Sequence, residues 1–409
     1  MFQQAQRRVA LVGIDGFSPP FIERYLREGA MPALKALMER GVTIPLVSTI
    51  PATTPVAWAA MSTGTYPATN GIEGFLLHRP GRCFDDRLSG VYADQLNAEP
   101  IWQTAFLNGL SSFVVKFPVS YPSVAATLRI DGAAGWGGLT CLHEIAGART
   151  NGWPENKDGT IEQSAGWRGA VPNGLVPLWF GTLTLPNVWG RAPIVFALAV
   201  SARDADTVVS IAHVPDWQAA DTTLGPSEWS EPILVEAVDR RGERRRCAAR
   251  FKALAVGRAP LRLRLFNTPV HELEGHTNAD DRWRRHLLAA GPIEEQTDPT
   301  PLFSGAIDMA THVERCRLNT DWLCRVSRSI LESEPWNLFM VHTHIVDWAH
   351  HLLHGAVDPR HPLYDAARAD EADSLIRRFY AMTDELVASV VESAGGEANV
   401  IVMGDHGQD

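Results

Sequence analysis

Short apolar runs alternate with amphipathic stretches in the first and last parts of the chain. The first run, at 9–14, is continuous and has three β-branched residues, which is typical of a strand buried on both faces of a sheet. The runs predict strands at 9–14, 42–50, 112–117, 336–346 and 399–403. Apolar residues at helical spacing predict helices at 101–108 and 307–332, one or two helices at 365–394, and two helical pieces within 21–40, where Gly29 and Pro32 break the pattern. Strands that alternate with helices predict an α/β fold whose parallel sheet is sandwiched by helices.

The pattern changes in the middle of the chain, where Gly, Trp and Pro become frequent and helical spacing disappears. Strands are predicted there at 192–200, 207–214, 232–238 and 261–266. We interpret 123–298 as a β-rich insert that caps a discontinuous catalytic domain formed by 1–122 and 299–409. The tryptophans of the insert either line a pocket or form its core: Trp136, Trp153, Trp167, Trp179 and Trp189.

Polar residues able to do chemistry stand where the predicted strands of the α/β part end. Asp15 follows the first strand, Thr54 opens a helix, and Asp347 and Asp405–His406 follow the last two strands. In a parallel sheet these positions converge at the carboxyl edge, where open α/β folds bind ligands. Carboxylates gathered there repel one another unless a cation lies between them, and oxygen with imidazole ligands suits zinc or manganese.

Each of these features also has a plain structural interpretation. Asp15–Gly16 is a common turn sequence, and Thr54 before Pro55 is a favoured helix start. Asp347 and His351 are one helical turn apart, which also suits a surface contact. Their joint occurrence in this order favours a functional site.

Composition narrows the function. The net charge of −10 argues against a nucleic-acid scaffold, which rewards dense Lys and Arg. The five cysteines form no C-x-x-C pair, which favours a reducing compartment. No stretch reaches the length of about eighteen apolar residues that a membrane span needs. We therefore expect a cytoplasmic enzyme that acts on a small molecule and not at a membrane.

Several short segments, taken together, carry a resemblance to a known family. They are Val12–Gly16, Thr54–Trp58, Thr63–Pro67, Gly71–Ile72, Phe117–Pro122, Asp347 with His351, Asp358–Pro359, Pro362–Tyr364 and Gly404–Gly407. The chain resembles the alkaline phosphatase superfamily, specifically its type I phosphodiesterase and nucleotide pyrophosphatase branch. The resemblance implies an alkaline-phosphatase-like fold, and 123–298 matches the variable insert of that family only in position.

The resemblance also implies a reaction and its residues. It implies a phosphoester hydrolase that uses two divalent metal ions, zinc or alternatively manganese, with Thr54 as the nucleophile and Thr53 as the weaker alternative. A phosphothreonine would form and then be hydrolysed. The implied ligands are Asp15, Thr54, Asp405 and His406 for one metal and Asp347 and His351 for the other, with His350 as the unused neighbour of His351.

Departures from the family pattern leave alternatives open. The family takes a further His for the second metal from beyond the Asp–His–Gly turn, whereas this sequence ends at Asp409. We expect that a C-terminal part is missing; otherwise His342 or His344 substitutes, or that metal is weakly held. Asn70 stands where the family usually has His, and Glu73–Phe75 replace an Asn that contacts the phosphoryl group. The alternatives to a hydrolase are a phosphate-transferring mutase and a metal-poor binding module.

Overall fold

The protein, a computed structural model, is described over 8–122, 126–130, 141–146, 149–152, 160–187, 189–273, 290–291 and 298–408. The chain divides into two compact units. One comprises Met1–Trp136, His276–Pro299 and His312–Asp409, and the other comprises Gly137–Gly275 and Thr300–Thr311. The predicted limits of the catalytic domain and its insert stay predictions.

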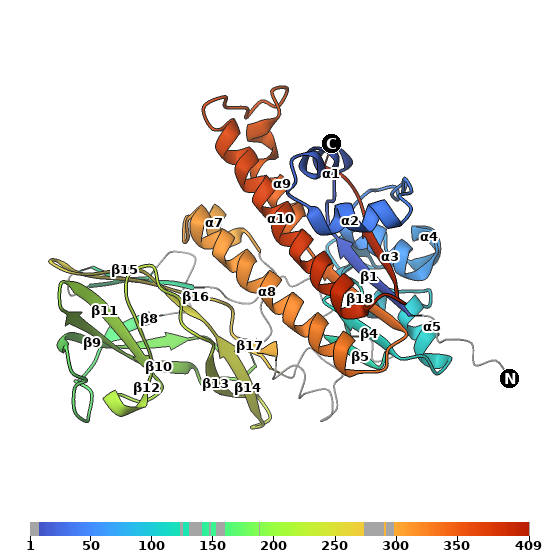
Figure 1. The fold of residues 1–409 in the computed structure, drawn as a ribbon. Coiled ribbons are helices and arrows are strands. Elements are labelled where there is room, and N and C mark those ends of the chain that lie inside the picture. Colours follow the sequence, from blue (N-terminus) through green and yellow to red (C-terminus); the bar gives the residue numbers. More distant parts are fainter. Residues whose placement is uncertain are drawn as a thin grey trace. The chain divides into compact units, whose positions relative to one another are not determined.

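A five-stranded sheet with the order β19-β1-β18-β4-β5 forms the centre of the first unit (Figure 1). Its strands are β1 (Val9–Ile14), β4 (Ser112–Val115), β5 (Leu128–Ile130), β18 (Leu338–Thr343) and β19 (Asn399–Gly404). All neighbouring strands pair in parallel. Ile14 at the end of β1 lies opposite both Thr343 and Gly404, so β1, β18 and β19 end at the same level.

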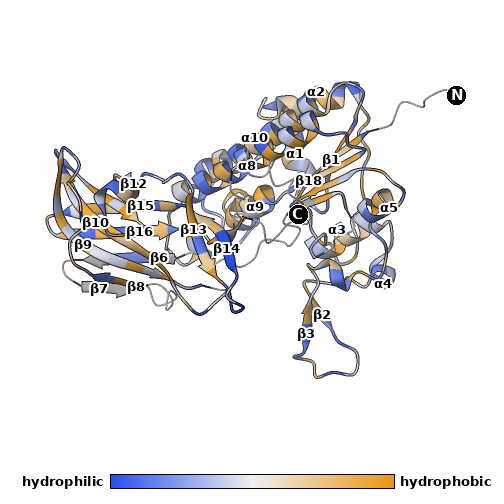
Figure 2. Cartoon of the chain, turned by 90° about the horizontal axis from the view of Figure 1, so that it is seen from below, coloured by the Kyte–Doolittle hydropathy of each residue, from blue (hydrophilic) through white to orange (hydrophobic). Residues whose placement is uncertain are grey.

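Helices cover both faces of this sheet. Helices α3 (Thr54–Thr63) and α5 (Ile101–Leu107) lie on one face, and α10 (Ala369–Ala394) packs against β1 and β19 on the other (Figures 1 and 2). Trp58 and Trp102 bury their rings among apolar side chains of the strands, including Leu11. The predicted α/β fold with a parallel sheet between helices is confirmed.

Further short elements complete the description of this part of the chain. They are α1 (Pro19–Arg27), α2 (Pro32–Arg40), α4 (Pro67–Asn70), β2 (Leu76–His78), β3 (Arg87–Ser89), a 3₁₀ turn at Ala93–Gln95, α9 (Ile345–Val357) and the part of α8 (Met309–Ser333) from His312 onward. Helix α7 (Thr300–Phe303) belongs to the second unit. Within the described ranges, no helix combines the length and apolar character needed to cross a bilayer.

The strand predicted at 42–50 is wrong. This segment has no regular secondary structure, and no described strand pairs with it. Val42, Val47 and Ile50 are 86%, 92% and 94% exposed. An apolar run becomes a strand only where a neighbouring strand takes its hydrogen bonds and a core covers its side chains.

The second unit is made of antiparallel sheets. Their orders are β12-β11-β10-β9-β8, β13-β14-β17 and β15-β16-β6-β7. The strands are β6 (Cys141–Ala146), β7 (Arg149–Gly152), β8 (Thr160–Gln163), β9 (Leu175–Leu185), β10 (Ile194–Arg203), β11 (Asp206–Ala212), β12 (Ala220–Leu224), β13 (Ile233–Val238), β14 (Arg244–Ala249), β15 (Phe251–Arg258), β16 (Leu261–Asn267) and β17 (His271–Glu272), with a 3₁₀ turn at Trp217–Ala219.

The tryptophans of this unit serve its core where they are described. Trp167 and Trp179 are buried in apolar clusters, and Trp189 packs against one of them. Trp136 and Trp153 lie outside the described residues. The core interpretation of these rings therefore holds for the described three.

Buried histidines give the fold a pH dependence, shown by His312 on α8. Its ring is fully buried, and burial, with a smaller effect of Arg315, lowers its pKa to about 3. In the unfolded state the pKa of this histidine is near 6.5, so the unfolded state binds the proton first as the pH falls. The contribution of His312 to stability is therefore full above pH 6.5 and is lost as the pH drops toward 3. We expect the His312→Phe variant to lose about 1 kcal/mol less unfolding free energy than the parent between pH 7.5 and 5.5. Urea unfolding at both values measures this.

The matched control is His361→Phe, which alters an exposed histidine of the same unit. This variant should lose as much stability as the parent over the same interval. Equal losses for the parent and the His312→Phe variant would show that His312 is not held neutral.

Candidate active site

The ends of three parallel strands bring Asp15, His344 and Asp405 to one edge of the sheet. Each residue follows its strand directly, and the register of the strands places all three at the same level. Asp347 follows in the first turn of α9, and Thr54 is the first residue of α3. The strand register therefore brings Asp15, His344 and Asp405 to the carboxyl edge of the sheet.

The Thr54 hydroxyl points into this cluster. Its Oγ1 donates to Asp15 Oδ1 at 3.2 Å and lies 3.5 Å from Nε2 of His406. Pro55, the second residue of the helix, has no backbone N–H. Because N–H groups of the first helical turn have no partner within the helix, a proline there costs the helix no hydrogen bond. Thr53, the alternative, has a buried hydroxyl with no hydrogen-bond partner among the described atoms. Thr54 therefore faces the carboxylates.

Asp15 is held on its second oxygen by groups from two elements. Its Oδ2 accepts a hydrogen bond from Trp58 Nε1 at 2.9 Å and lies 3.1 Å from His342 Nε2. Sequence analysis missed this role of Trp58, although its four-residue spacing from Thr54 puts both side chains on one helix face. The indole fixes the carboxylate so that Oδ1 faces Thr54.

Asp405 and His406 close the cluster from β19. Asp405 Oδ1 accepts from the backbone N–H of Gly16 at 3.1 Å, whereas its buried Oδ2 has no hydrogen bond from the described residues. His406 Nε2 lies 3.5 Å from Asp15 Oδ1 and 3.4 Å from Asp405 Oδ2. Nitrogen and oxygen atoms of the three side chains thus surround one small volume.

The second predicted pair is more open. Nε2 of His351 lies 3.4 Å from Asp347 Oδ1, and its side chain is 53% exposed. Gln408, which the sequence analysis did not name, donates to the same oxygen of Asp347. His350 instead reaches the Tyr380 hydroxyl at 2.9 Å. The structure places His351, and not His350, beside Asp347.

The glycine at position 16 allows Asp15 and Asp347 to lie close to each other. Its φ is +63°, and a Cβ built on it would lie 2.8 Å from the Asp347 Cα. Any side chain there would meet the backbone of α9 as well as an unfavourable conformation. A glycine is therefore required between Asp15 and Asp347.

Without a cation between them, the buried carboxyl groups of Asp15 and Asp405 differ in how readily they ionise. Burial, and then the neighbouring charge of Asp15, raise the pKa of Asp405 well above its ordinary value. Burial opposes ionisation of Asp15 too, yet His344 and His342 hold its pKa well below the usual range. Ligand atoms of Asp15, Asp347 and His406 lie within 4.8 Å of one another. Oxygen and imidazole donors at this spacing fit a divalent ion.

Comparison with known proteins places the chain in a family. The family model of type I phosphodiesterase / nucleotide pyrophosphatase matches residues 9–205 and 186–409. The chain belongs to this family. The resemblance inferred from the motifs is thus confirmed, and the residues that match the family model lie in both units of the chain.

Similarity to solved structures is partial. Two crystal structures of phosphonoacetate hydrolase from Sinorhizobium meliloti 1021, with phosphonoformate and with phosphonoacetate, match with 30% and 29% identity. Each has a TM-score of 0.25, and the match covers 27% of this chain and 26% of the hydrolase chain. The chain thus matches about a quarter of the length of these relatives. No curated protein matches the chain significantly.

Asn70 has a structural role next to the Thr54 helix. It is fully buried, its Nδ2 donates to Thr65 O at 3.0 Å, and its Oδ1 accepts from Ile72 N–H at 3.0 Å. Both ends of the amide are used to hold the turn after α4. Asn70 therefore supports the loop that follows the Thr54 helix.

Proposed function

We propose that this protein hydrolyses small-molecule phosphoesters with Thr54 as the nucleophile and two divalent metal ions, zinc or manganese. The observation that carries the proposal is the Thr54 hydroxyl at a helix N-terminus, 3.2 Å from a buried carboxylate and 3.5 Å from an imidazole. Membership of the type I phosphodiesterase / nucleotide pyrophosphatase family supports it.

The proposed ligands follow the two clusters at the sheet edge. The ligands would be Asp15, Thr54, Asp405 and His406 for one ion and Asp347 and His351 for the other. When bound, the ions supply positive charge that favours ionisation of the threonine hydroxyl and offsets charge on the phosphoryl group. Asp405 Oδ2 accepts no hydrogen bond from the described residues, and this supports the donor set. The raised pKa of Asp405 beside the lowered pKa of Asp15 supports it too.

The chain's own groups would do the rest. Thr54 lies at the N-terminus of α3, where backbone N–H groups of the first turn would suit a phosphoryl oxygen. Trp58 and Asp15 fix the direction of the Thr54 hydroxyl. Attack by Oγ1 forms the Thr–phosphate bond and breaks the ester bond, and water then cleaves the Thr–phosphate bond and frees the hydroxyl.

The proposed setting is the cytoplasm. No disulfide joins the described cysteines Cys83, Cys247, Cys316 and Cys324, which suits a reducing compartment. The acidic net charge of −10 supports a small ester over a nucleic-acid scaffold as substrate.

A direct assay tests the proposal. The protein, loaded with zinc or manganese, should hydrolyse p-nitrophenyl phosphate or bis-p-nitrophenyl phosphate and stop when a chelator removes the metal. Absence of turnover on both esters, with metal bound, would argue for the binding-module alternative. A phosphate-transferring mutase would instead give a phosphorylated product from an alcohol acceptor.

Metal should also stabilise the fold. At a free zinc concentration of about 100 times Kd, we expect the unfolding free energy to rise by about 2.7 kcal/mol. The Asp405→Asn variant should lose most of this gain because it removes a charged ligand, whereas Asp94→Asn, an exposed change, should keep it. Thermal melts with and without zinc measure the difference. An equal gain in all three proteins would place the metal elsewhere.

A further inference from the structure

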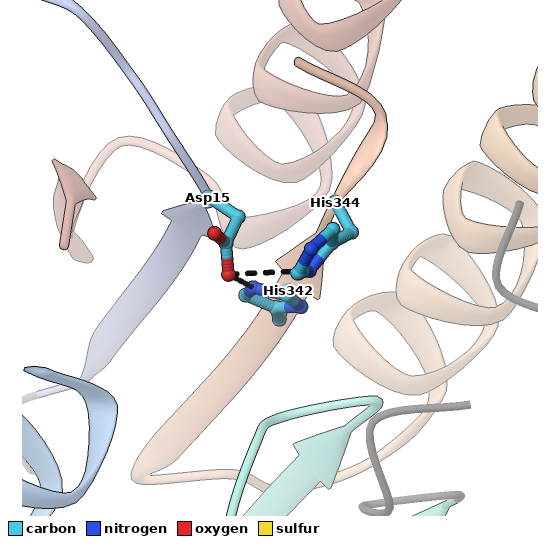
Figure 3. Close-up of side chains that lie close together, drawn as sticks. All are labelled: Asp15, His342 and His344. Atoms are coloured by element: carbon cyan, nitrogen blue, oxygen red, sulfur yellow. Dashed lines mark hydrogen bonds and ion pairs between the residues drawn. The ribbon is translucent and has the colours of Figure 1, made fainter. Parts of the chain in front are cut away.

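Two histidines beside Asp15 have no role in the proposed mechanism. His342 is the next-to-last residue of β18, and His344 follows the strand directly, so the two side chains project from the same side. His342 Nε2 lies 3.1 Å and His344 Nδ1 lies 3.2 Å from the same oxygen of Asp15, Oδ2 (Figure 3). Both rings are turned toward the carboxylate.

The spacing of these three atoms suits ligands of one metal ion. All three residues are buried, and their donor atoms lie within 4.8 Å of one another. Ligands at about 2.0–2.1 Å from a tetrahedral ion lie roughly 3.3 Å apart. Two imidazoles with one carboxylate are a donor set of catalytic zinc and non-haem iron sites.

The far side of the His344 ring supports the same assignment. Its Nε2 lies 3.0 Å from Asp347 Oδ2. In the neutral ring, an N–H on Nε2 that donates to this carboxylate would leave the lone pair of Nδ1 for a metal ion beside Asp15 Oδ2. A carboxylate behind a histidine in this way orients the ring and strengthens it as a ligand. His342 Nδ1 has no hydrogen-bond partner among the described residues, so Nε2 is its only engaged atom.

We propose that His342, His344 and Asp15 bind a divalent transition-metal ion. Asp15 then serves two ions, with Oδ1 toward Thr54 and His406 and Oδ2 toward the histidine pair. The inference rests on the proposed function because both use Asp15. It adds two nitrogen ligands that the six proposed metal-binding residues do not include.

X-ray absorption on the full chain is the first test. Protein loaded with one equivalent of Co²⁺ or Zn²⁺ should show two imidazole ligands on the ion if the histidine pair binds it. The clusters in the proposed mechanism offer one imidazole per ion, from His406 or His351. A single imidazole on the ion at this loading would overturn the inference, and the measurement needs no variant.

Substitution separates ligation from hydrogen bonding. His342→Gln and His344→Gln can each still donate a hydrogen bond to Asp15, but glutamine is a poor ligand for zinc. We expect each variant to weaken zinc binding by about 10²-fold in equilibrium dialysis, with Mg²⁺ binding unchanged. His350→Gln is the matched control, since it is a buried histidine of the same unit that faces Tyr380. Unchanged zinc affinity in the folded His342→Gln and His344→Gln variants would mean that these histidines only orient Asp15.

The outcomes also distinguish this inference from the proposed function. Ester hydrolysis that depends on Thr54, together with a single imidazole on the ion, would remove the inference and leave the function. Two imidazoles on the ion in a protein that hydrolyses neither ester would remove the function and leave the site.

Discussion

Replacing Thr54 with alanine is expected to lower kcat/KM for phosphoester hydrolysis by about 10³-fold or more, while zinc binding changes little. The magnitude follows from removing the only group proposed to form a covalent bond with phosphorus. Zinc affinity should persist because Asp15, Asp405 and His406 remain around the ion. Steady-state hydrolysis of bis-p-nitrophenyl phosphate and zinc dialysis on the same preparation measure both quantities.

Two neighbouring variants control this experiment. Thr53→Ala removes the hydroxyl one residue earlier, which has no described hydrogen bond, and should keep activity within about threefold of the parent. Thr54→Ser retains a hydroxyl at the helix start and should recover much of the activity lost in Thr54→Ala. If Thr54→Ala hydrolysed the ester at the parent rate, the nucleophile would have to be another group.

The strands of the α/β fold could be predicted where the sequence has an uninterrupted apolar run, and the helices where apolar residues recur at helical spacing. Residues 9–14 and 400–403 are apolar runs with Asp15 and Asp405 close behind them, and they form β1 and most of β19. The segment at 42–50 is also rich in apolar residues, although Thr43, Pro45, Ser48 and Thr49 interrupt them, and it stays exposed and unpaired among the described strands. Hydrophobic pattern shows what a segment can bury, whereas a strand also needs a neighbour, and the neighbour is set by the rest of the chain.

The candidate site was predictable to the level of which residues meet. Strand ends in a parallel sheet share an edge, so Asp15, Asp347 and Asp405 could be grouped from sequence. Which oxygen faces which partner could not, because Trp58 and His342 reach Asp15 through packing between α3, β1 and β18. Contacts between residues hundreds of positions apart follow from strand register, which spacing along the chain does not contain.

The alanine variant of Gly16 is expected to lower ester hydrolysis by about 10²-fold and to weaken binding at the Asp347 and His351 pair. The added Cβ would lie 2.8 Å from the Asp347 Cα and 3.0 Å from its Oδ1, so α9 must move away from β1. A displacement of about 1 Å at a catalytic ligand is enough for a loss of that size. The positive φ adds roughly 1–2 kcal/mol of strain to the folded state.

Gly29→Ala separates the two effects. Gly29 has φ +74°, yet nothing lies within 4 Å of a Cβ built there, so this variant carries the backbone strain without the contact. We expect Gly29→Ala to melt at a lower temperature while its zinc content and hydrolysis rate stay near those of the parent. If Gly16→Ala behaved like Gly29→Ala, with a lower melting temperature but an unchanged hydrolysis rate, close approach of α9 to β1 would not be needed for activity. A selective loss in Gly16→Ala would instead tie catalysis to the distance between Asp15 and Asp347.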